Sequence, residues 1–154
     1  MLRNIQNDTV YADGTKKVSE AMKRGTFVTV NASGEIVKAT ALAGAYMLDR
    51  GLKLTQEVAM GFPVSQYDDT QVVVDKGEYA ELVPLVASKW ATSEYANDVV
   101  DGISYLTVGA DGKLKKSTDP TILVFNGFMN DGYKADGTQH KLAVFTINPA
   151  VKLA

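Results

Sequence analysis

The stretch "VTVNASGEIVKAT", residues 28–40, decides the fold class because it holds both strands and the turn of a β-hairpin. β-Branched and aromatic residues on either side favour extended backbone. Between them Asn31, Ala32, Ser33 and Gly34 form a loop of turn formers, in which Gly34 can adopt a positive φ without a Cβ clash. The pattern predicts an antiparallel hairpin over residues 26–39.

The same phrase returns as "LTVGADGKLKKST" at residues 106–118 and predicts a second hairpin over residues 104–116. The identical positions are Thr29, Val30, Ala32, Gly34, Lys38 and Thr40 in the first copy and Thr107, Val108, Ala110, Gly112, Lys116 and Thr118 in the second. Two explanations stay open, an internal duplication and the convergence of hairpins that share a loop type. In both, the phrase builds the fold and performs no chemistry.

Further strand signals occur at residues 71–74, from Tyr79 towards Val86, and in a final pair that includes residues 142–147. Helical signals are weak: residues 18–22 fit a helix end or a strand, and residues 88–99 hold the spacing of a short helix. We therefore expect a mainly β fold. It is a sandwich or barrel of short antiparallel strands and hairpins with at most one or two short helices.

The domain organisation that we expect is an N-terminal arm followed by one β-rich domain. Residues 1–17 are polar without a sustained apolar period, which is typical of an arm that reaches a neighbouring subunit. Residues 18–154 form the domain, and residues 41–70 within it are an inserted lobe.

Composition excludes several classes of function. The 16 basic and 18 acidic residues are mixed along the chain, so no basic stripe exists and we expect no nucleic-acid partner. No apolar stretch is long enough to span a bilayer, and the first residues lack the apolar core of a signal peptide, so we expect no membrane partner. The absence of cysteine removes disulfides, thiolate catalysis and cysteine-ligated metals.

Candidate catalytic and metal-binding residues are few. His140 is the one histidine, no serine elbow accompanies it, and we expect it to be dispensable. Residues 109–112 and 130–137 resemble calcium loops only in their Asp and Gly content, because they lack the spacing of an EF-hand, and we expect them to be turns. Asp68 and Asp69 are adjacent and therefore do not form a paired carboxylate site. The sequence predicts neither a cofactor nor an enzyme.

Both hairpin blocks resemble bacteriophage head decoration (capsid cement) proteins and related virion structural proteins. The matching positions are Gly25, residues 28–30, Gly34 and residues 36–40 in the first block, and Gly77, Gly102, residues 106–108, Gly112 and residues 114–118 in the second. The resemblance covers about the central two thirds of the chain and does not extend to residues 41–70.

The resemblance implies a small β-rich subunit that is made in the host cytoplasm and bound to the outer capsid surface of the virion. Its implied partners are the major capsid protein and copies of itself, often as a trimer, and the family has no catalytic residues to carry over. Apolar and aromatic residues suited to such an interface are Leu2, Ile5, Val10, Tyr11, Tyr46, Phe62, Tyr67, Trp90 and Tyr95. The competing expectation is that most of the aromatic ones belong to the core.

Other functions remain open from the sequence. A tail-tube or neck component is also built from β-barrels. A β-sandwich carbohydrate-binding module would stack sugars on Trp90 and Tyr95. An enzyme with a carboxylate-based site is the third alternative, and the one that the sequence supports least.

Overall fold

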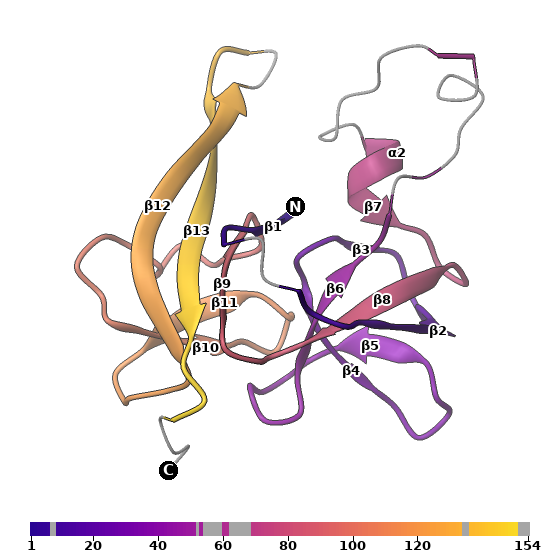
Figure 1. Ribbon diagram of the computed structural model, residues 1–154, viewed down its shortest axis with the longest axis horizontal. Coiled ribbons are helices and arrows are strands. Elements are labelled where there is room, and N and C mark those ends of the chain that lie inside the picture. Colours follow the sequence, from indigo (N-terminus) through magenta and orange to yellow (C-terminus); the bar gives the residue numbers. More distant parts are fainter. Residues whose placement is uncertain (7–8, 52, 54–59, 62–68, 134–135, 151–154) are drawn as a thin grey trace.

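The computed structural model describes the chain except for residues 7–8, 52, 54–59, 62–68, 134–135 and 151–154 (Figure 1). The described part is mainly β, with strands in three antiparallel sheets. The predicted fold class is confirmed.

The strands are β1 (Leu2–Asn4), β2 (Asp13–Lys17), β3 (Met22–Lys23), β4 (Phe27–Val30), β5 (Ile36–Lys38), β6 (Tyr46–Asp49), β7 (Val73–Val74), β8 (Tyr79–Pro84), β9 (Ser88–Thr92), β10 (Tyr105–Val108), β11 (Leu114–Ser117), β12 (Leu123–Tyr133) and β13 (Gln139–Ile147). One helical turn, α2 (Asp69–Val72), precedes β7. The six-stranded sheet has the order β1-β9-β13-β12-β10-β11, the five-stranded sheet has the order β2-β8-β6-β4-β5, and β3 pairs with β7. Figure 1 shows the six-stranded sheet on the left and the five-stranded sheet on the right.

Both copies of the repeated phrase form hairpins, as predicted. β4 pairs with β5 and β10 pairs with β11, and both pairs are antiparallel. Each turn glycine has a positive φ, 78° at Gly34 and 74° at Gly112. Each of these glycines donates its N–H to a carbonyl 3.0 Å away, Asn31 in the first turn and Gly109 in the second. The register of the hairpins is thus set locally by their turns.

Three of the expected elements differ in the structure. The strand expected over residues 71–74 starts only at Val73, because α2 continues to Val72. The short helix expected within residues 88–99 is absent. The first part is strand β9, paired on one side with β1 and on the other with β13, and Tyr95 in the second part forms a bridge with Leu114. Of the two possibilities for residues 18–22, the structure has Met22 at the start of strand β3.

The described part of residues 1–17, where we expected an arm that reaches a neighbouring subunit, pairs with strands of the body. β1 adds to the edge of β9, and β2 adds to the edge of β8. The expectation of an inserted lobe over residues 41–70 is wrong for its first part, because β6 lies between β4 and β8 in the five-stranded sheet. Most of the remaining lobe falls outside the described residues.

The largest core cluster joins the two large sheets. Phe27 of β4 and Phe145 of β13 contribute rings whose centroids are 6.0 Å apart. A second cluster lies between the five-stranded sheet and the β3–β7 pair and includes Val28, Leu48 and Val74. β13 is apolar on both faces, as its sequence predicts for a strand covered on both sides. The first cluster therefore ties both large sheets into one body.

Candidate functional site

Two residues expected at an interface are core residues instead. Leu2 is 4% exposed and Trp90 is 5% exposed, and both belong to the main core cluster. The Trp90 indole Nε1 donates to Ser88 Oγ at 2.8 Å, which satisfies its one polar group inside the protein. Neither side chain offers a face to a partner subunit or to a sugar ring.

The other residues expected at an interface divide into three groups by their exposure. Ile5, Val10, Tyr46 and Tyr95 are half-buried and pack against the core clusters with part of their surface. Tyr11 is 88% exposed, the highest exposure among the large hydrophobic side chains described. Phe62 and Tyr67 lie outside the described residues.

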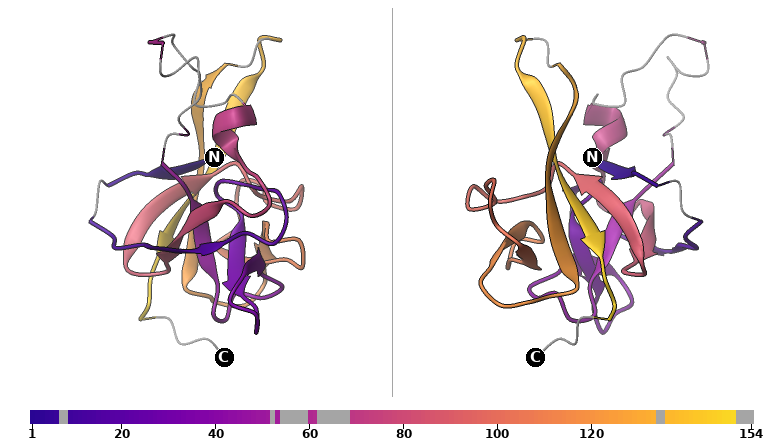
Figure 2. Two further views of the ribbon diagram at one scale, coloured as in Figure 1. Left: turned by 90° about the vertical axis from the view of Figure 1, so that its right-hand side faces the viewer. Right: turned by 60° about the vertical axis from the view of Figure 1, so that its left-hand side comes forward.

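The structure adds exposed apolar side chains that were not predicted, namely Met60, Tyr79, Val86, Val100 and Tyr133. Tyr79 carries a recognisable signal, because Tyr79 and Glu81 alternate along β8 with the buried Ala80 and Leu82. Side chains two residues apart on a strand point to the same face, so a tyrosine two residues from an exposed glutamate also faces solvent. Tyr133 is the last residue of β12 and is exposed. Figure 2 shows that this end of β12 projects beyond the rest of the sheet.

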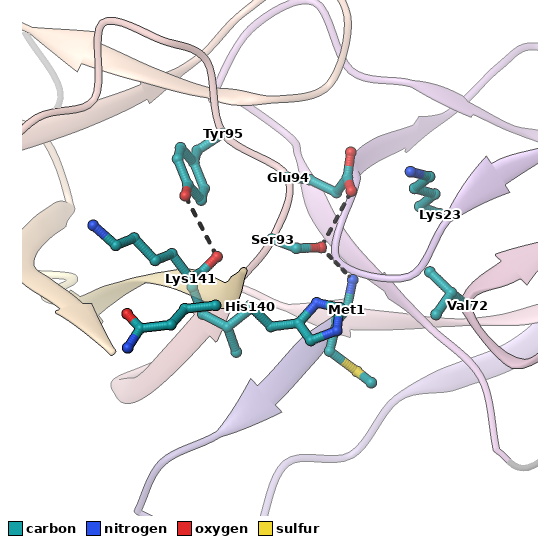
Figure 3. Close-up of a pocket in the computed structure, with 10 residues that line it drawn as sticks. Met1, Lys23, Val72, Ser93, Glu94, Tyr95, His140 and Lys141 are labelled. Carbon is teal, nitrogen blue, oxygen red and sulfur yellow. Dashed lines mark hydrogen bonds between the residues drawn. The ribbon is translucent and has the colours of Figure 1, made fainter. Parts of the chain in front are cut away.

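A polar cavity of about 350 Å³ lies between one end of the six-stranded sheet and the β3–β7 region (Figure 3). It is lined by Met1, Lys23, Val72, Ser93, Glu94, Tyr95, Gln139, His140, Lys141 and Leu142. These residues come from five places in the chain: the N-terminus, β3, α2, the segment after β9, and the start of β13. Only tertiary pairing brings them together, so no local motif could have revealed the cavity.

The α-amino group of Met1 is the most perturbed titratable group at this cavity. Burial lowers its pKa from the usual 8.0 to about 5, an effect that the negative charge of Glu94 partly offsets. Its nitrogen donates to the Arg24 carbonyl at 2.5 Å and to Ser93 Oγ at 2.6 Å. A neutral amine has two N–H groups, so these two acceptors satisfy the form that burial favours.

Ser93 and Tyr95, two further polar residues of the cavity, are also hydrogen-bonded. Ser93 Oγ accepts a hydrogen bond from the Met1 amine and donates one to Glu94 Oε1 at 3.2 Å. Burial raises the pKa of Tyr95, whose hydroxyl donates to the Lys141 carbonyl at 3.4 Å. His140 lines the cavity, and Figure 3 shows its ring beside Met1. The hydrogen bonds of the Met1 amine anchor the N-terminus to the residues that follow β3 and β9.

The Asp–Gly loops behave as turns where they are described. Asp111 Oδ1 accepts from the Lys113 N–H at 3.2 Å, and Asp136 Oδ1 accepts from both the N–H and the hydroxyl of Thr138. Across the described ranges no group of three or more His, Cys, Asp or Glu residues is placed to hold a metal ion. Of the pair Asp68 and Asp69, the first lies outside the described residues.

Comparisons with protein-family models, curated proteins and solved structures give no match to this chain. None of the helical segments that the structure describes is both long and apolar enough to cross a membrane.

Proposed function

We propose that this chain is a structural protein of a phage virion, a decoration protein that binds the outer capsid surface and stabilises the contacts between capsomers. One observation carries the proposal. The two glycine-turn phrases, on which the resemblance to head decoration proteins depends, both form hairpins, and each hairpin is the outer part of one of the two large sheets. The body that contains these hairpins is small and β-rich, and its first strand, β1, belongs to the same sheet as its last strand, β13.

The chemistry of the described residues agrees with a structural role. The most perturbed group of the polar cavity is the amine of Met1, which hydrogen bonds to the Arg24 carbonyl and Ser93 Oγ hold in place. The carbohydrate-binding alternative loses its main premise, because the Trp90 ring is buried and cannot stack on a sugar. A tail-tube or neck component is the alternative that the experiment must separate.

The test is co-sedimentation of the purified protein with tailless heads, and separately with purified tails, of the phage whose genome encodes it. We expect saturable binding to heads and none to tails. Binding to tails alone would favour the tube or neck alternative, and binding to neither would refute the proposal. Size-exclusion chromatography with light scattering tests the expected self-association, including the trimer.

A further inference from the structure

The two large sheets repeat one five-stranded topology. The first half uses β2, β4, β5, β6 and β8, and the second uses β9, β10, β11, β12 and β13. In each half the second strand pairs with the third and the fourth, and the fifth pairs with the fourth and the first. The resulting orders are β5-β4-β6-β8-β2 and β11-β10-β12-β13-β9. When the strands are numbered from one to five within each half, both orders are the same, namely third, second, fourth, fifth and first.

The equivalence extends to hydrogen bonds outside the strands. Val18, just after β2, forms a parallel bridge with Ile36 at the start of β5. Tyr95, after β9, forms the corresponding bridge with Leu114 at the start of β11. The next residue in each half donates its N–H to the same strand residue, Ser19 to Ile36 at 2.9 Å and Ala96 to Leu114 at 2.8 Å.

β2 and β9 are therefore equivalent strands, but their outer edges differ. β9 accepts an added antiparallel strand, β1, with Leu2 opposite Thr92 and Asn4 opposite Trp90. β2 is the last strand of its sheet, and no described residue pairs with its outer edge. The outer edge of β9 thus pairs with a further strand, β1, whereas the equivalent outer edge of β2 has no such partner among the described residues.

The β2 edge offers the Lys17 N–H for strand addition, whereas the Thr15 N–H already donates to Asp13 Oδ1 at 2.9 Å and the register of β2 against β8 shifts between Asp13 and Lys16. Because the Val18 N–H donates inward to the Glu78 carbonyl at 3.0 Å, and because inward and outward groups alternate, the Lys17 N–H points away from β8. Two strongly exposed tyrosines lie beside this edge: Tyr11 precedes β2 and is 88% exposed, and Tyr79, opposite Lys17, is 59% exposed. The Lys17 Nζ lies 5.0 Å from the centre of the Tyr79 ring.

The charge of the edge selects the kind of strand that fits. β2 carries Lys16 and Lys17 against one carboxylate, Asp13, whose Oδ2 lies 3.7 Å from Lys16 Nζ, so the edge remains net positive. Lysines on an edge oppose pairing with apolar or basic strands. A strand with acidic side chains would pair favourably with them. The outer edges of β5 and β11 are less open, because the residues after β2 and β9 bridge to their first residues.

We propose that the outer edge of β2 binds an extended acidic segment of the capsid subunit as an added antiparallel strand, in the position that β1 occupies on β9. This inference depends on the proposed function and names the contact through which it would operate. Main-chain hydrogen bonds would supply the pairing, and Lys16 and Lys17 would select the acidic segment.

The test measures head binding of two β2 variants and a matched control. Lys17→Pro removes the outward N–H while leaving the inward ladder, a change that edge strands tolerate. Lys16→Glu/Lys17→Glu reverses the charge of the edge. The control Lys115→Glu/Lys116→Glu makes the same charge change on exposed residues of β11. We expect at least tenfold weaker binding for both β2 variants, unchanged binding for the control, and unchanged circular dichroism for all three.

Each outcome decides one point. If the wild-type protein does not bind heads, the proposed function fails and this inference fails with it. If the wild type binds and the β2 variants bind equally well, only the β2 edge is refuted. If the β2 variants instead convert an oligomer to a monomer in light scattering, the occupant is a second copy of this chain and the capsid strand is refuted. If Lys17→Pro is unfolded, the charge-reversal pair and its control decide.

Discussion

Gly34 and Gly112 occupy the same place in the two copies of the repeated phrase but have different surroundings. A Cβ on Gly34 would meet nothing within 4 Å, whereas a Cβ on Gly112 would lie 2.5 Å from the Phe27 carbonyl oxygen and 2.7 Å from Thr26 Cγ2. The second turn packs against β4, where the Phe27 N–H donates to the Gly112 carbonyl at 2.7 Å. Gly34 therefore serves only its own turn, whereas Gly112 also permits the second hairpin to contact β4 of the first half.

This contrast predicts unequal costs for the same substitution. Both Gly34→Ala and Gly112→Ala place a Cβ at a positive φ, which costs about 1–2 kcal/mol. Gly112→Ala also overpacks a backbone contact, a further loss of roughly 1–3 kcal/mol. Urea unfolding of the two variants measures the difference, with Gly34→Ala as the control for backbone strain. Equal destabilisation would show that the turn does not pack against β4 in solution.

The buried amine of Met1 predicts that stability depends on pH. Its pKa of about 5 in the folded protein lies below the usual 8.0, so the unfolded chain binds the proton more tightly between these values. The free energy of unfolding should be greatest above pH 8 and should fall as the pH decreases towards 5, by a few kcal/mol in all. Denaturant unfolding at pH 8, 6.5 and 5 measures this slope.

Two controls separate the amine from other groups. The pKa values of Asp13 and Glu78 are lowered, so their effect on stability appears only below their usual values of 3.8 and 4.5. His140 also lines the cavity, so its replacement is the second control. If the Met1 amine causes the slope, His140→Gln should keep it. A flat profile in the wild type, or a slope that disappears with His140, would contradict the assignment to Met1.

At the scale of single elements, the hairpins could be predicted because a turn and its two strands are neighbours in sequence. β1 and β9 could not be predicted in this way. The partner of Leu2 is Thr92, and the spacing of Trp90 and Glu94 fits a helix as well as it fits a strand. The cavity beside them depends on the same long-range pairing. Leu2 and Trp90 were expected at an interface because their residue types suit one, but pairing decides which face is covered.

The integration of β1 predicts opposite results for two neighbouring residues. Leu2 is buried, whereas the Arg3 side chain is 30% exposed and pairs with Asp131 at 2.8 Å. Leu2→Ala should destabilise the fold by roughly 2–5 kcal/mol, and Arg3→Gln by about 1 kcal/mol or less. Thermal and urea unfolding of both variants provide the measurement. If Leu2→Ala is as stable as the wild type but binds heads more weakly, residues 1–6 are an arm after all.

At the scale of the whole molecule, the repeated phrase marks a repeat that is larger than the phrase. The sequence likeness is confined to one hairpin in each half, yet the structure repeats five strands and the bridge that follows the first of them. The long connection between β6 and β8 and the short one between β12 and β13 hide this repeat in the sequence, because they place equivalent strands at unequal spacings. Shared topology favours internal duplication over the convergence of two hairpins.

The shared core predicts that the two halves unfold together. Ile36 and Leu114 are equivalent residues, both 0% exposed, but Ile36 belongs to the cluster within the first half and Leu114 to the cluster that joins the halves. Each substitution by alanine should cost roughly 2–5 kcal/mol. Because Phe27 and Phe145 pack across the junction, each variant should show one cooperative transition at a lower temperature, with a calorimetric enthalpy equal to the van't Hoff enthalpy. Two separate transitions in Ile36→Ala, with only the first one shifted, would show that the halves fold as independent domains.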